Sequence, residues 1–94
     1  MDIERIKQME ERFDRASDAV RRMTEALEAY ESVKDDINTL NEYYGSEEWK
    51  QDLADDEAGL LPKDLKRGVL SEDGIWDLLS EHTDVLHQMK QMCQ

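Results

Sequence analysis

Proline, glycine, cysteine and long apolar runs are all scarce in this chain of 94 residues, which holds one Pro, four Gly and one Cys. No run approaches the roughly 18 consecutive apolar residues that can span a bilayer, so we expect no membrane segment. The N-terminus also lacks the basic region and apolar run of a secretion signal. The single cysteine, Cys93, cannot form an intramolecular disulfide, which agrees with a reducing compartment. Together these absences predict a cytoplasmic protein.

Basic residues are also few, because 12 Lys and Arg face 24 Asp and Glu, for a formal net charge of -12. This balance disfavours direct binding to nucleic acid or to an anionic membrane surface. The sequence has no phosphate-binding loop, dinucleotide fingerprint or serine nucleophile motif. Its two histidines, His82 and His87, are five residues apart and cannot chelate one metal ion as a four-residue pair can. We therefore expect no cofactor and no small-molecule ligand.

The first half of the chain does contain a long apolar stripe. Its members recur at alternating intervals of three and four residues, and no Gly or Pro occurs before Gly45. This pattern predicts one helix over residues 1–44, roughly 60 Å long at about 1.5 Å per residue. Two successive three-residue steps, from Leu27 to Val33, either overwind a coiled coil locally or mark a drifting stripe. The members are Ile6, Met9, Phe13, Ala16, Val20, Met23, Leu27, Tyr30, Val33, Ile37, Leu40 and Tyr44.

Residues 45–74 form a connector that holds all four glycines and the only proline. Ser46 has the side chain of an N-cap, and it predicts a short helix over residues 47–57 that Gly59 would end. Pro62 suits the first position of a further short turn of helix, and Gly68 suits the left-handed C-terminal cap of that turn.

The last helix is expected over residues 72–93, with Ser71 as its N-cap. Its apolar face consists of Ile75, Leu78, Leu79, Val85, Leu86, Met89 and Met92. The sequence thus predicts an all-α fold in a single domain over residues 1–94. A long N-terminal helix leads through a connector with short helices to an antiparallel C-terminal helix, as a helical hairpin or small bundle with a coiled-coil-like seam.

The two long helices differ in length, because the last one spans only about 30 Å. Folded back, it would cover residues 20–44 and leave Ile3, Ile6, Met9 and Phe13 without a cover. An uncovered apolar stripe of this length is unusual in a soluble monomer. Either the connector reaches back over it, the end frays, or a second chain packs there. The leading hypothesis is a non-enzymatic protein–protein interaction module that forms a homodimer or binds a partner helix.

Two further groups of side chains are candidates for interaction. The basic residues Lys63, Lys66 and Arg67 either bind an anionic partner or pair with the acids of residues 52–57 and hold the connector in place, and the second interpretation is favoured. The aromatic residues Tyr43, Tyr44, Trp49 and Trp76 either form a recognition surface or fill the core where elements meet. For Trp49 we favour the core.

The acids Asp52, Asp55, Asp56 and Glu57 raise two alternatives. Carboxylates three or four residues apart on a helix can hold a hard cation, as in a metal-dependent helical hydrolase. About six acid pairs at three-residue spacing are expected by chance in so acidic a chain, which weakens this alternative. The other alternative is an acidic mimic of nucleic acid that occupies a basic cleft. Residues 45–94 favour it with 12 acids against 5 bases, whereas the first helix mixes both charges.

The middle third also carries a resemblance. It lies in Tyr43-Tyr44-Gly45-Ser46, then Glu48-Trp49, then Asp56-Glu57-Ala58-Gly59, then Leu61-Pro62, and finally the run from Asp64 to Gly74. This pattern resembles a family of small bacterial proteins catalogued as domain of unknown function 4298. The resemblance implies a bacterial, cytoplasmic protein with a helical fold whose distinctive part is the connector, and it implies no catalytic residue.

Overall fold

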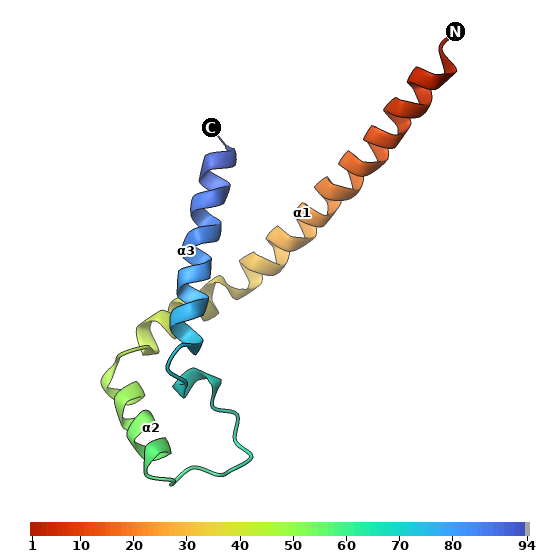
Figure 1. Ribbon diagram of the computed structural model, residues 1–94. Coiled ribbons are helices and arrows are strands. Elements are labelled where there is room, and N and C mark those ends of the chain that lie inside the picture. The colour runs from red at the N-terminus through yellow and green to blue at the C-terminus, as the bar shows by residue number, and fades with distance from the viewer. Residues whose placement is uncertain (94) are drawn as a thin grey trace. The chain divides into compact units, whose positions relative to one another are not determined.

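The computed structural model describes residues 1–93, and within them the fold is all-α, without a β-strand. Three α-helices and one short 3-10 helix follow each other along the chain (Figure 1). The predicted order of a long helix, a short helix and a C-terminal helix is therefore confirmed. No helix of this part of the chain is both long enough and apolar enough to cross a membrane.

The first helix, α1, spans Ile3–Tyr43, close to the predicted residues 1–44. It begins where the Asp2 carboxylate accepts a hydrogen bond from the backbone N–H of Arg5 at 2.9 Å, an N-terminal cap. It ends before Gly45, whose φ of +80° lies in the left-handed region that a helix cannot continue through.

Helix α2 spans Glu47–Glu57, as predicted. The Ser46 hydroxyl accepts a hydrogen bond from the backbone N–H of Trp49 at 3.1 Å, so Ser46 is the N-cap. At the other end Gly59 has a φ of +72° and donates to the Asp56 carbonyl, while Leu60 donates to the Asp55 carbonyl. These two bonds form a Schellman motif, which ends the helix at a glycine.

The prediction for Pro62 and Gly68 is wrong. Residues 62–65 make only one turn, closed by a 3.2 Å hydrogen bond from Leu65 N–H to the Pro62 carbonyl, and this turn does not continue into a helix. Gly68 does not have a left-handed φ and instead begins the 3-10 helix η1, Gly68–Leu70. Its carbonyl accepts both the backbone N–H and the hydroxyl of Ser71, at 3.2 and 2.7 Å. Gly68 thus leads into the last helix and does not close an earlier one.

Helix α3 spans Gly74–Met92 and begins two residues later than predicted. The Ser71 hydroxyl does accept the backbone N–H of Gly74 at 3.0 Å, as a capping serine would. Residues 71–73, however, form a bend, and the first helical carbonyl to accept a bond is that of Asp73, from Asp77 N–H at 2.7 Å.

The chain divides into two compact units, Met1–Lys34 and the part from Asp35 onward, and α1 runs through both. The first unit is a helical segment alone. In the second unit η1 packs against both α2 and α3, and the two buried hydrophobic residues of the described chain, Leu70 and Ile75, lie in η1 and in the first turn of α3. The single domain over residues 1–94, and the antiparallel packing of the last helix on the first, stay predictions.

Candidate interaction surfaces

The largest exposed apolar feature lies in the first unit. Large apolar side chains of α1 that follow each other at intervals of three to seven residues are between 40 % and 66 % exposed along the whole unit. Because this unit is one helix, nothing inside it buries them. The exposed set extends beyond the four residues expected from the sequence. We call it the N-terminal stripe, and it consists of Ile3, Ile6, Met9, Phe13, Val20, Met23, Leu27 and Val33.

Burial changes along α1 where the spacing changes. Val33, at the end of the two three-residue steps, is 40 % exposed, whereas Ile37 and Leu40 are half-buried in the second unit. The extra three-residue step rotates the apolar face around the helix axis, because three residues fall short of a full turn. The apolar residues after the step contribute to the second unit, while those before it remain exposed.

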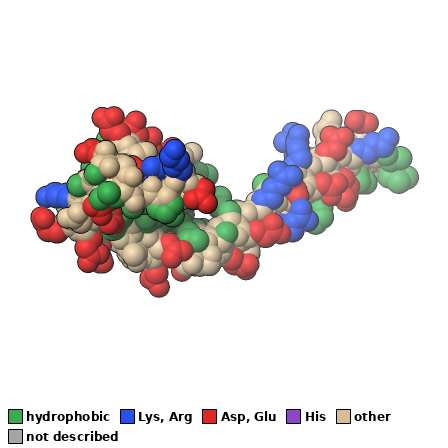
Figure 2. Space-filling model, turned by 90° about the horizontal axis from the view of Figure 1, so that it is seen from below, with side chains coloured by type: hydrophobic (Ala, Val, Ile, Leu, Met, Phe, Trp, Pro, Cys, Tyr) green, Lys and Arg blue, Asp and Glu red, His purple; other side chains and the backbone are tan. Residues whose placement is uncertain are grey.

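Charged side chains cover the other faces of the first unit. The Asp18 carboxylate pairs with Arg21 and, at 3.0 Å, with Arg22, and Lys34 lies 3.8 Å from Glu31. Figure 2 shows acidic and basic side chains mixed along this helix with apolar side chains among them. Such exposed pairs add little stability individually. They do keep the polar faces of the helix close to neutral.

In the second unit, Tyr43 joins the end of α1 to α2. Its hydroxyl donates a 2.6 Å hydrogen bond to the Asp52 carboxylate. This hydrogen bond raises the pKa of Tyr43 to about 12, with smaller contributions from desolvation and from the negative charges of Asp52 and Glu48. The sequence alone does not indicate this pair, because a nine-residue separation across a glycine turn carries no signal of contact.

Trp49 joins α2 to η1. Its ring packs edge-on against Tyr44 with the ring centroids 5.1 Å apart, and its indole N–H donates a 3.0 Å hydrogen bond to the Val69 carbonyl. Trp49 and Tyr44 are half-buried, so Trp49 lies where elements meet, whereas the buried core residues are Leu70 and Ile75. Trp76, in contrast, is 56 % exposed on α3.

Arg67 is the basic residue that closes the connector. Its guanidinium lies 2.7 Å from the Asp56 carboxylate, which confirms the predicted ion pair across the Gly59 turn. Lys63 and Lys66 are exposed and make no ion pair within residues 1–93. The three bases therefore do not act as one cluster.

The acids of α2 have separate partners. Asp52 accepts from Tyr43, Asp55 accepts from the Gln51 amide at 2.9 Å, and Asp56 pairs with Arg67. Within residues 1–93 no three His, Cys, Asp or Glu side chains are placed so that they could hold one metal ion. The partners of these acids thus lie within α2, at the end of α1 and in the connector.

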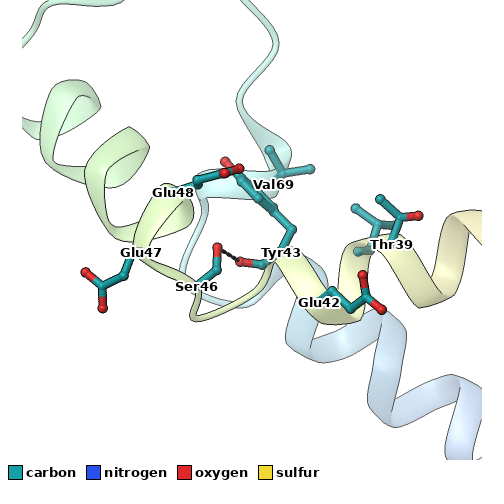
Figure 3. Close-up of a pocket in the computed structure, with 8 residues that line it drawn as sticks. Thr39, Glu42, Tyr43, Ser46, Glu47, Glu48 and Val69 are labelled. Carbon is teal, nitrogen blue, oxygen red and sulfur yellow. Dashed lines mark hydrogen bonds between the residues drawn. The ribbon is translucent and has the colours of Figure 1, made fainter.

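Two open grooves flank η1. One, of about 460 Å³, is mainly apolar and is lined by Leu40, Lys66, Gly68, Val69, Gly74, Ile75 and Leu78. The other has an acidic rim and is lined by Thr39, Leu40, Glu42, Tyr43, Ser46, Glu47, Glu48 and Val69. Figure 3 shows Tyr43 and Glu48 directed towards Val69, whereas Glu47 points away from them. The dashed bond there joins the Ser46 hydroxyl to the Tyr43 carbonyl at 2.6 Å.

Comparison with known proteins identifies the family. The profile described as Domain of unknown function (DUF4298) matches residues 6–92, which is nearly the whole chain. Searches of curated proteins and of solved structures find no match. The matched range includes the connector, with its Ser46 cap, Trp49 junction and Arg67 ion pair. The chain therefore belongs to the DUF4298 family.

Proposed function

We propose that this protein is a non-enzymatic protein–protein interaction module that binds another helix through the N-terminal stripe. This proposal rests on the exposure of that stripe. Eight apolar side chains of one helix are each 40 % or more exposed, and no other element of their own unit covers them. Contiguous apolar surface of this extent is typical of an interface.

The contacts inside the second unit also favour the N-terminal stripe as the binding surface. Its connector is held by hydrogen bonds and an ion pair among its own residues, including Tyr43 with Asp52 and Arg67 with Asp56. These side chains are engaged in contacts inside the second unit, which favours the N-terminal stripe as the binding surface. We also propose a cytoplasmic location, with which the single exposed thiol, Cys93, agrees.

A site-specific photo-crosslinker tests the proposal in cells of the native host. A benzophenone amino acid is introduced at Phe13, in the stripe, or at Gln8, an exposed position on another face of the same helix. We expect crosslinked protein from position 13 and much less from position 8. Equal yields at the two positions, or no product at position 13, would contradict an interface on the stripe. The mass of the product identifies the bound chain as a second copy or as another protein.

A further inference from the structure

We infer that the occupant of the N-terminal stripe is a second copy of this chain, paired antiparallel with a two-fold axis at residue 18. This inference rests on the proposed function and specifies its partner. The exposed apolar area of the stripe is sufficient for a stable dimer. Its eight side chains, at about 100 Å² each, offer on the order of 800 Å², which is the area that each partner buries in an interface of standard size.

Charge separates the two units of the molecule. Residues 1–34 carry 9 acids and 7 bases, a net of -2, whereas residues 35–94 carry 15 acids and 5 bases, a net of -10. The stripe thus lies in the part of the chain that another copy repels least. A different protein attracted by the negative charge of this chain would be strongly basic. It would bind the acidic residues 35–94 and not the nearly neutral stripe.

The spacing of the stripe makes it complementary to itself. In an antiparallel pair about residue 18, facing positions have numbers that sum to 36, so Phe13 meets Met23 and Met9 meets Leu27 of the second copy. Ile6 meets Tyr30 in the same way, and Ala16 meets Val20 at the centre. Large side chains thereby face large ones, while the small layers adjoin each other at the axis, where the two helices can approach closely.

A parallel pair fits less well. It would place Ala16 against Ala16 directly beside Phe13 against Phe13, which leaves a void next to a crowded layer. It would gain an Arg5–Glu10 pair on each side, but exposed pairs of this kind contribute little. In the antiparallel pair the two charged residues that flank the seam, Glu10 and Arg12, lie nearest the uncharged Thr24 and Ala26, so neither of them directly faces a like charge.

The acidic units decide the orientation. Each copy continues into a -10 unit directly after residue 34. Parallel helices would bring both acidic units to one end of the seam. Antiparallel helices place them at opposite ends, separated by a seam of about 45 Å at 1.5 Å per residue, several times the roughly 8 Å over which charges act at physiological ionic strength.

Spin-label distances test the orientation in the full chain. A single cysteine is placed at Glu4 or at Asp18 in a Cys93→Ser background, and each is labelled and measured by pulsed dipolar spectroscopy. Both positions are exposed or half-exposed and lie off the stripe. Antiparallel pairing predicts more than about 40 Å between labels at residue 4, because 28 residues of rise separate them, and about 20 Å at residue 18.

The outcomes are distinct. A long distance at residue 4 with a short one at residue 18 supports the antiparallel pair. Short distances at both positions mean a parallel dimer, and long distances at both mean another register, and each overturns the inference while the proposed function stands. No intermolecular distance at either position overturns the second copy as the occupant, and the photo-crosslink at Phe13 then decides separately whether a foreign chain fills the stripe.

Discussion

At the scale of single residues, the connector is held by a few side chains that reach across it. Tyr43, Trp49 and Arg67 each contact a residue at least nine positions away. The roles of Trp49 and Arg67 were predictable in kind, because a large aromatic and a base beside an acid run have few other uses in a small helical protein. The partners of Tyr43 and Trp49 were not predictable, since Asp52 and Val69 become their neighbours only after the turns have formed.

Tyr43 provides a test of this network by titration. Because the Asp52 carboxylate accepts a hydrogen bond from the Tyr43 hydroxyl and would repel the tyrosinate, the pKa of Tyr43 is raised to about 12 from the ordinary value of 10. We expect Asp52→Asn to lower the pKa of Tyr43 towards 10, as followed by ultraviolet absorbance of tyrosinate. Asp55→Asn removes the same charge without touching the hydrogen bond and serves as the control, and Tyr43→Phe assigns the late transition.

The same pair makes stability depend on alkaline pH. The raised pKa of Tyr43 in the folded state means that its stabilising contribution is complete below pH 10 and is lost as pH rises from 10 to about 12. Urea unfolding of the wild type and of Tyr43→Phe should therefore differ below pH 10 and converge towards pH 12. A constant difference over this range would contradict the assigned hydrogen bond.

At the scale of elements, the ends of helices were predictable where a local signal acts alone. Ser46 and Gly59 bound α2 as expected, because a serine cap and a left-handed glycine act within four residues. The prediction failed between Pro62 and Gly74, where residues of η1 pack on two helices and this tertiary packing overrides local preference. The spacing alone predicted a left-handed cap at Gly68, whereas in the structure the Gly68 carbonyl accepts a hydrogen bond from the Ser71 hydroxyl.

Substitution by alanine is expected to affect stability differently at two glycines of this segment. A Cβ on Gly74 would lie 2.3 Å from the Gly68 carbonyl oxygen and 2.6 Å from the Ser71 hydroxyl, whereas a Cβ on Gly68 would meet nothing within 4 Å. Gly74→Ala should therefore destabilise the protein by about 1–3 kcal/mol through forced displacement of the Ser71 cap. Gly68→Ala should change stability by less than about 1 kcal/mol, because its φ suits alanine. Urea denaturation monitored by helicity measures both, and equal losses would contradict the close approach at Gly74.

At the scale of the whole molecule, the sequence indicated that the first helix is too long for the rest of the chain to cover. The structure extends the exposed stripe from Phe13 to Val33, beyond the four residues expected from helix lengths alone. The expectation of four exposed residues follows from the lengths of the first and last helices only if the last helix packs along the first. It could not detect that the double three-residue step divides the apolar face into an exposed part and a part that joins the second unit.

The most direct test of the central claim is the absolute mass of the purified protein, measured by light scattering on a sizing column at low and high salt. We predict about twice the chain mass of 11.0 kDa at both salts, because the interface is apolar. Phe13→Glu should reduce the mass to that of one chain, while Gln8→Glu, which adds the same charge on another face, should not. A single-chain mass for the wild type at both salts, or a dimer that survives Phe13→Glu, would contradict the account.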